Sequence, residues 1–233
     1  MKCERCISVY DMKINTPQLI VLEGLDGSGK ETQSNLLTNR MSEASDKPVL
    51  KISYPDYSSQ SSALVKMYLA GEMGTIEQVN VYAASSCYAL DRYINYMNHW
   101  KSTFEAGGII VADRYTTSNI IYQMSKLPVT QRNEYLEWLI RYEYELLCLP
   151  RPTTVIYLDM HPNTSQMLLH KRYGGDDSKK DIHERNLLYL TDCRKTALEA
   201  SKELGWKVIT CFNKEYEPLP IHEIAEMVWQ NCF

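Results

Sequence analysis

The sequence predicts an α/β protein, a three-layer sandwich in which helices flank a five-stranded, mostly parallel sheet. Short apolar runs alternate along the chain with longer segments whose apolar residues recur at helical spacing. This alternation is typical of βαβ units, whose parallel strands are covered by helices on both faces. Distinctive polar residues follow the first three runs directly, at the strand ends where such sheets bind ligands.

Five apolar runs are the expected strands. They span residues 19–22, 49–52, 109–112, 154–158 and 207–210. A helical pattern from about 77 to 101 predicts one long helix. We expect residues 18–233 to form a single domain, because a chain of 233 residues can bury a core of its own. Residues 1–17 are expected to be a poorly ordered N-terminal extension, whose CxxC pair, Cys3 and Cys6, lacks the second pair that a zinc site needs.

Charge and cysteine content limit the possible partners. The 25 Lys and Arg residues are outnumbered by 29 Asp and Glu residues, so no bulk positive field is available to hold nucleic acid. The sequence has no apolar run of about 18 residues, the length that a membrane-spanning helix needs. Seven cysteines without a signal-peptide pattern favour a reducing compartment. We therefore expect a cytoplasmic protein that binds small molecules rather than nucleic acid or membrane.

The segment after the first run has the GxxxxGK pattern of a phosphate-binding loop, placed between a strand and a helix. Its glycines let backbone N–H groups turn toward phosphate oxygens, and the helix N-terminus adds partial positive charge. The ammonium of Lys30 can reach the same phosphates. This context predicts a P-loop NTPase-like fold. The expected nucleotide-binding residues are Gly24, Gly27, Ser28, Gly29, Lys30, Glu31 and Thr32.

Glu31 stands where most such loops carry a serine or threonine that contacts Mg²⁺ or orders its water. One interpretation keeps the ion on phosphates, water and Asp113, with Glu31 in the outer coordination shell or turned away. The other gives Glu31 only a helix-start role, which the helix dipole favours. The sequence leaves both open.

A second polar cluster, Asp113-Arg114-Tyr115, ends the third expected strand. Asp113 can orient a metal ion or an attacking oxygen, and Arg114 offers a rigid two-pronged donor for another phosphate. Two phosphate-binding elements at one sheet edge favour transfer between two nucleotides. The guanine-reading NKxD motif expected of a GTPase is absent from the sequence.

These segments resemble the thymidylate kinase family, in its bacterial type with a glycine-rich P-loop. The resemblance runs from Leu19 to the C-terminus and rests on EGLDGSGKETQ, YPDY, CYALDRY, DRYTTSNIIY and KDIHE, in the family's order. It implies ATP-dependent phosphorylation of dTMP to dTDP by direct in-line transfer, a step of dTTP biosynthesis. Mg²⁺ as cofactor, a homodimer, and adenine placed against residues 210–219 are implied as well.

The resemblance also assigns an acceptor site. Asp26 would accept a hydrogen bond from the sugar 3′-hydroxyl, and Tyr122 would crowd the 2′ position. Tyr88 would stack on thymine, while Arg92 and Asn119 would bond the base edge. Without the family, Tyr88 would be interpreted as a core residue and Arg92 as the ion-pair partner of Asp91 or another acid. The implied dTMP-binding residues are Asp26, Tyr54, Pro55, Tyr57, Tyr88, Arg92, Arg114, Ser118, Asn119 and Tyr122.

Residues 171–185, the lid segment, resemble the mobile lid that closes over the phosphates in this family. Cationic side chains that arrive with a lid would stabilise charge on the transferring group. The candidates are Lys171, Arg172, Lys179 and Lys180, with Arg172 and Lys180 favoured. The catalytic set is then Lys30, Asp26, Asp113, Arg114, Arg172 and Lys180. Asp113 and Glu184 are the expected metal residues, Glu184 through water, and His183 stands where relatives often have tyrosine.

Departures from the family pattern keep two alternatives open. The phosphate loop contains no arginine, and YPDY lacks the arginine that some relatives place after the proline. This leaves Arg114 as the expected main ligand of the acceptor phosphate. One alternative is a kinase for another nucleotide, deoxynucleotide or deoxynucleoside. The other is a non-catalytic P-loop nucleotide-binding protein, which the unusual Glu31 would suit.

Overall fold

The protein is described by a computed structural model, in which residues 18–176, 178 and 180–232 are placed. Its centre is a sheet of five parallel strands in the order β2-β3-β1-β4-β5. The strands are β1 (Gln18–Gly24), β2 (Val49–Ser53), β3 (Ile109–Asp113), β4 (Thr154–Asp159) and β5 (Lys207–Thr210). Each coincides with one of the predicted apolar runs, so the prediction of a five-stranded, mostly parallel sheet is confirmed.

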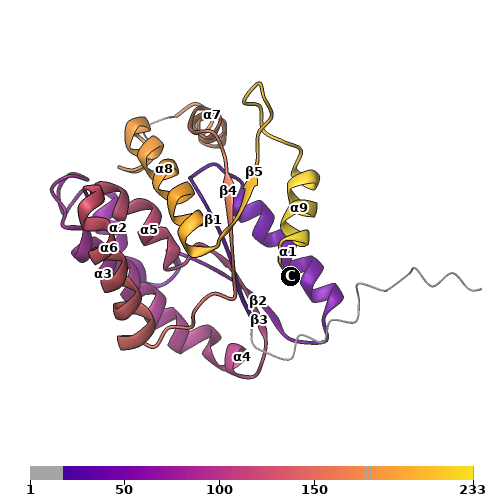
Figure 1. Cartoon of the computed structure of the whole chain (residues 1–233). Helices are drawn as coiled ribbons and strands as arrows, with labels where there is room; N and C mark the ends of the chain where they lie inside the picture. Colours follow the sequence, from indigo (N-terminus) through magenta and orange to yellow (C-terminus); the bar gives the residue numbers. More distant parts are fainter. Residues whose placement is uncertain (1–17, 177, 179, 233) are drawn as a thin grey trace, which may run out of the picture.

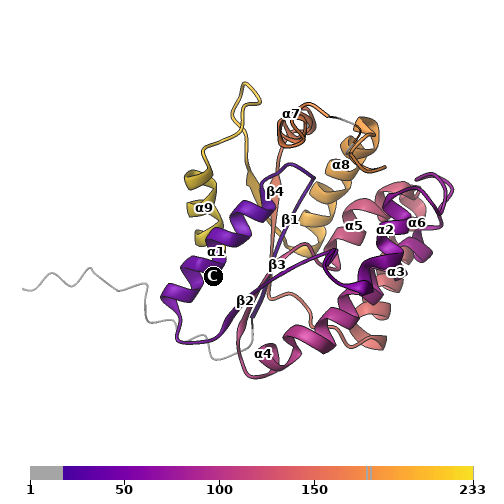
Figure 2. The ribbon, with the colours of Figure 1, turned by 180° about the vertical axis from the view of Figure 1, so that it is seen from behind.

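Helices cover both faces of this sheet (Figure 1). The main helices are α1 (Lys30–Ala44), α2 (Ala63–Leu69), α3 (Val81–Asn95), α5 (Thr117–Tyr122), α6 (Val129–Ile140), α7 (Pro162–Arg172), α8 (Leu187–Leu204) and α9 (Ile221–Gln230). On one face, Ile20 and Leu22 of β1 pack in a core cluster with residues of α1 and α9. The side-by-side position of these two helices is clear from behind (Figure 2). Leu19 and Val21 point to the opposite face, and the predicted three-layer sandwich is confirmed.

The long helix predicted for residues 77–101 is shifted toward the C-terminus. The helix begins at Val81, the first residue of α3. The side chain of the preceding Asn80 accepts hydrogen bonds from the backbone N–H groups of Tyr82 and Ala83, at 2.9 and 3.3 Å. This is an N-cap, which fixes the first turn of a helix. The helix then passes through a π-helical turn, η3 (Tyr96–Trp100), into α4 (Lys101–Glu105). A second π-helical turn, η5 (Arg141–Leu146), follows α6 directly, and a 3-10 turn, η4 (Met124–Lys126), precedes α6.

The parallel register brings the segments after β1, β2 and β3 to one edge of the sheet. The backbone N–H of Arg114, just past β3, donates to the carbonyl of Leu22 in β1 at 3.0 Å. The N–H of Tyr54, just past β2, donates to the carbonyl of Asp113 at 3.0 Å. The two clusters found in the sequence therefore meet with the YPDY segment at the carboxyl edge, as parallel topology requires.

Some sequence predictions fall outside the described residues. These are the disorder of residues 1–17, the role of Cys3 and Cys6, and any role of Lys179. Within the described part of the chain, no helix combines the length and the apolar character needed to cross a membrane.

Candidate active site

The glycine-rich loop connects β1 to α1 through backbone conformations that favour glycine. Gly27 and Gly29 have φ angles of 78° and 87°, and Gly29 is the N-cap of α1. A Cβ atom on Gly27 would lie 2.7 Å from the carbonyl oxygen of Ser165 in α7, so a side chain there would collide with the neighbouring backbone. The loop is thereby held in a tight turn that leads directly into the N-terminus of α1, a favourable place for an anion.

Lys30 lies folded against this loop. Its side chain is 6% exposed, and its Nζ donates to the carbonyl oxygen of Leu25 at 2.7 Å. Burial, together with the positive charge of Arg114, lowers the pKa of Lys30 to about 8, although Asp26 and Asp113 act in the opposite direction. A phosphate dianion at the loop would favour the charged form of Lys30.

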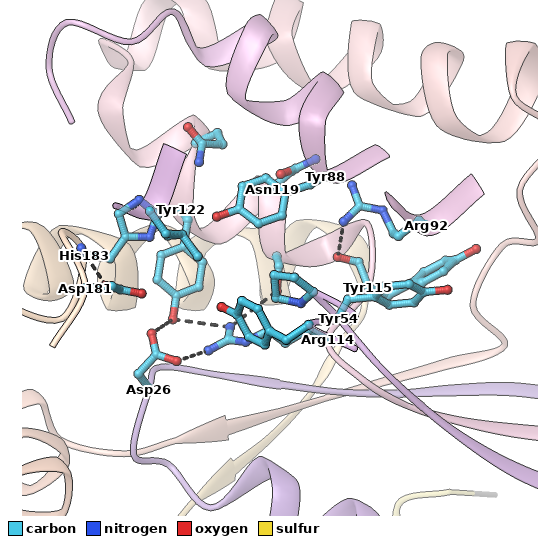
Figure 3. A pocket seen from close by; sticks show the side chains of 15 residues that line it. Asp26, Tyr54, Tyr88, Arg92, Arg114, Tyr115, Asn119, Tyr122, Asp181 and His183 are labelled. Carbon is cyan, nitrogen blue, oxygen red and sulfur yellow. Dashed lines mark hydrogen bonds and ion pairs between the residues drawn. The ribbon is translucent and has the colours of Figure 1, made fainter. Parts of the chain in front are cut away.

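An ion pair joins the phosphate loop to the segment after β3. Arg114 Nη2 pairs with Asp26 Oδ1, and the hydroxyl of Tyr122 donates to Asp26 Oδ2 at 3.1 Å. Figure 3 shows these three side chains pointing toward one another. Burial raises the pKa of Asp26, but the charges of Arg114 and Lys30 outweigh this effect and bring the pKa to about 2. Arg114 also has a φ angle of 69°, an uncommon backbone conformation that tends to occur at functional sites.

Glu23 is a buried carboxylate to which the sequence analysis gave no role. It accepts hydrogen bonds from the backbone N–H of Tyr115 at 3.1 Å, from Thr117 Oγ1 at 2.7 Å and from Ser118 Oγ at 2.9 and 3.0 Å. Burial raises its pKa, against the opposing charge of Arg114. The sequence feature that marks Glu23 as a candidate functional residue is its acidic side chain within an otherwise apolar strand. Glu23 holds the segment after β3, and with it Arg114, against the phosphate loop.

A single cavity lies beside this ion pair, and the whole predicted dTMP-binding set lines it (Figure 3). The lining residues are Asp26, Tyr54, Pro55, Tyr57, Leu69, Tyr88, Arg92, Arg114, Tyr115, Ser118, Asn119, Tyr122, Gln123, Asp181 and His183. They come from the phosphate loop, the segments after β2 and β3, α2, α3, α5 and the lid segment. Leu69, Tyr115 and Gln123 were not predicted to line it. Tyr115 lies in the cluster after β3 but was given no role, and no motif includes Leu69 or Gln123.

Tyr88, Arg92 and Asn119 form the end of the cavity where the base is expected. Arg92 is 1% exposed and makes a two-pronged ion pair with Glu143, at 2.6 and 2.7 Å. The ion-pair interpretation of Arg92 thus holds geometrically, with Glu143 as the acid. Asp91 instead accepts from Ser61 Oγ at 2.5 Å. Arg92 nevertheless lines the cavity, so the ion pair does not remove it from the site.

The lid segment contributes Asp181 and His183 to the same cavity. The ring of His183 stacks on that of Tyr122, with centroids 5.5 Å apart, and its Nε2 lies 2.9 Å from the hydroxyl of Tyr68. Burial lowers the pKa of His183 to about 3, so this ring is neutral near pH 7. Burial and the charge of Asp26 raise the pKa of Asp181 to about 7. The lid segment therefore packs on this cavity through a ring that is neutral near pH 7 and a carboxyl group whose pKa is raised.

The favoured lid cations lie in different places. Arg172, at the end of α7, is 3.4 Å from Glu31 Oε2, and both side chains are exposed. Lys171 is exposed as well. Lys180 is buried, and its Nζ donates to Gln166 Oε1 at 2.9 Å. Arg172 is thus placed beside the phosphate loop, whereas Lys180 contacts α7.

Neither expected metal residue belongs to a protein cage for an ion. Among the described residues, no group of three or more His, Cys, Asp or Glu side chains is arranged to hold a metal. Asp113 is 7% exposed at the end of β3. Glu184 accepts from the hydroxyl of Tyr173 at 3.1 Å and from the backbone N–H of Asp181 at 3.1 Å. A hard ion that keeps water and phosphate ligands is compatible with a single oxygen donor of this kind.

Comparison with known proteins shows the family of this chain. The family model for thymidylate kinase matches residues 22–219. The chain belongs to the thymidylate kinase family. The family prediction is confirmed, and with it the expectation of an enzyme that transfers phosphoryl groups to nucleoside monophosphates.

Several relatives are thymidylate kinases. The chain is 29% identical to one from Mycobacterium tuberculosis over 170 residues, which is 72% of this chain and 78% of the relative. It is 26% identical to one from Danio rerio over 197 residues, covering 82% and 81% of the two chains. The solved structure of the thymidylate kinase from Candida albicans has a TM-score of 0.67 at 23% identity, with 92% of this chain and 90% of that one covered. That structure supports the fold.

Proposed function

We propose that this protein transfers the γ-phosphoryl group of ATP to dTMP, giving dTDP and ADP. One observation carries the proposal: the Asp26–Arg114 ion pair joins the phosphate loop to the cavity that the predicted dTMP-binding residues line. A donor nucleotide on the loop and an acceptor in the cavity would therefore present their phosphates to the same two side chains. Tyr88, Arg92 and Asn119 lie on the cavity wall, where they would contact the base.

The reaction needs positioning and charge neutralisation more than acid–base chemistry. The acceptor phosphate is already anionic, so an oxygen can attack the γ-phosphorus in line without a strong base. Lys30 would hold the donor phosphates, and Arg114 would hold the acceptor phosphate. Asp26 and Tyr122 would bond and confine the sugar. Arg172 would meet the transferring group as the lid segment closes and excludes water.

Mg²⁺ is the proposed cofactor. Asp113 provides a carboxylate at the strand end. It is close enough to Lys30 for its charge to oppose the lowering of the lysine pKa. Held by Asp113 and the substrates, such an ion would supply positive charge that stabilises charge developing on the phosphates. Glu184 would take part only through water.

We further propose a cytoplasmic homodimer. Leu90, Ile94 and Met97 form a stripe along the exposed side of α3 and η3, and their exposed fractions are 40%, 40% and 44%. Exposed apolar side chains on successive turns of one helix are typical of an interface with another protein. A second copy of this chain is the occupant that the family resemblance implies.

The test is production of ADP from Mg-ATP with a panel of acceptors: dTMP, dUMP, dCMP, dGMP, UMP and thymidine. Turnover led by dTMP supports the proposal. Turnover led by thymidine would favour a deoxynucleoside kinase and would leave Arg114 without an acceptor phosphate to bind. ATP binding without acceptor-dependent turnover would favour the non-catalytic alternative.

A further inference from the structure

A buried carboxylate lies behind the base end of the cavity, and two of its partners line that cavity. Glu143, in η5, is 0% exposed. Its two oxygens accept from Arg92 Nε at 2.7 Å and from Arg92 Nη2 at 2.6 Å. Its Oε1 also accepts from Asn119 Nδ2 at 3.1 Å. One carboxylate therefore holds two of the polar side chains that line this end of the cavity.

The ion pair limits what Arg92 can offer to a ligand. A guanidinium has five N–H groups and no acceptor. Glu143 takes the Nε–H and one N–H of Nη2, while the carbonyl oxygen of Tyr115 lies 3.4 Å from Nη1. The side chain still has N–H groups left over where it lines the cavity. Arg92 is thus a hydrogen-bond donor whose guanidinium plane is fixed by its two hydrogen bonds to Glu143.

The same carboxylate fixes the amide of Asn119. Its Nδ2 faces Glu143 Oε1 at 3.1 Å and the carbonyl oxygen of Ser85 at 3.4 Å. Both neighbours only accept hydrogen bonds, so a flipped amide would set oxygen against oxygen. Oδ1 of Asn119 has no hydrogen-bond donor among the described residues and is left as an acceptor for a molecule in the cavity.

We propose that Glu143 is a positioning residue that fixes a donor, Arg92, beside an acceptor, Asn119 Oδ1, and thereby sets the base specificity of the enzyme. This pattern matches a pyrimidine with a 4-oxo group next to a ring N–H. A 4-amino pyrimidine reverses both groups, so it would face a donor with a donor and an acceptor with an acceptor. Unmatched buried polar groups give strong discrimination. The inference rests on the proposed function only in taking a pyrimidine monophosphate as the acceptor.

The test compares the protein with Glu143→Gln, which keeps the shape but replaces one carboxylate oxygen by a donor. The amide of Asn119 then loses its fixed orientation. We expect the KM for dTMP to rise about tenfold or more, and the ratio of kcat/KM for dTMP to that for dCMP to fall by about tenfold or more. The KM for ATP should not change. Glu145→Gln is the matched control, because Glu145 lies in the same turn with its side chain 60% exposed.

The inference is overturned if folded Glu143→Gln has an unchanged ratio of kcat/KM for dTMP to kcat/KM for dCMP, including the case in which both values fall by the same factor. If Glu143→Gln does not fold, Glu143→Asp decides, since it keeps the charge but shortens the arm by one methylene and should lower the same ratio. If the unaltered protein does not turn over dTMP, the proposed function fails. The inference is then tested by equilibrium binding, in which Glu143→Gln should narrow the difference in Kd between dTMP and dCMP.

Discussion

At the scale of single residues, the Asp26–Arg114 pair decides how the two halves of the site meet. Arg114 is 14% exposed and Asp26 26%, so this pair is shielded from solvent far more than a surface ion pair. The guanidinium of Arg114 is also held by the phosphate loop, because its Nη1 donates to the carbonyl oxygen of Gly24 at 3.3 Å. A phosphate that enters the cavity would find a guanidinium whose position is already set.

Arg114→Ala should raise the KM for dTMP by about 10- to 100-fold, the loss expected when charge-assisted hydrogen bonds are removed. The KM for ATP should change much less. Steady-state kinetics with each substrate varied in turn measures both. Arg40→Ala, which removes an exposed ion pair with Glu226, should leave both values unchanged. A near-normal KM for dTMP in Arg114→Ala would show that another group binds the acceptor phosphate.

The lowered pKa of Lys30 predicts that the activity of the enzyme depends on pH. Its pKa is lowered to about 8, so the free enzyme carries the ammonium below pH 8 and loses it above. We expect kcat/KM for ATP to fall as pH rises through about 8, because kcat/KM reports groups of the free enzyme. Lys30→Arg should be less active but should lack this limb, since arginine stays charged. A profile that is flat across pH 8 in the unaltered protein would contradict the assignment.

At the scale of elements, the structure relates the phosphate loop to the lid segment through Glu31. The sequence left Glu31 between an outer-shell role toward Mg²⁺ and a helix-start role. Its carboxylate lies 3.4 Å from Arg172, which favours a third role, the orientation of the lid cation. An exposed ion pair contributes only about 0–1 kcal/mol to stability, so any effect should appear in turnover rather than in folding.

Glu31→Ser should therefore lower kcat a few-fold and leave the melting temperature nearly unchanged. Arg172→Ala should lower kcat as well, and the double variant should lose less than the product of the two single losses, because the two side chains act together. Titration of turnover with Mg²⁺ provides the decisive comparison. A shifted magnesium midpoint in Glu31→Ser would return Glu31 to the outer shell of the metal.

At the scale of the whole molecule, the carboxyl edge of the sheet carries the candidate site, and the outer side of α3 and η3 carries the exposed apolar stripe. Tyr88 and Arg92, which we propose contact the base, belong to the same helix as Leu90 and Ile94. Contact between two copies along this stripe would also stabilise the helix that presents Tyr88 and Arg92 to the cavity.

Ile94→Glu should convert a dimer into a monomer, because it places a charge in the middle of the proposed interface. Light scattering coupled to size-exclusion chromatography measures the mass of each variant. Val129→Glu is the matched control, since Val129 is 75% exposed on α6. If the unaltered protein is a monomer, or Ile94→Glu stays a dimer, the stripe is not the interface.

The sequence by itself determined the sheet, the phosphate loop and most of the residues that line the cavity. Strand runs and the GxxxxGK spacing are local patterns, and parallel topology brings strand ends to one edge whatever the details of packing. The sequence alone therefore places the cluster after β3 beside the phosphate loop. The predicted start of the long helix is wrong, because the side chain of Asn80 caps the helix and so sets where its first turn begins.

Only the tertiary structure decided which groups hold these residues in place. Glu143 reaches Arg92 across 51 positions of sequence and Glu23 reaches Ser118 across 95, and no local pattern marks either pairing. The contact of Glu31 with Arg172 spans 141 positions. Such partners are chosen by packing in three dimensions, because a buried charge must find a complementary group wherever the fold brings one. Which residues line the cavity follows largely from motifs and topology, whereas what orients them follows from the folded core.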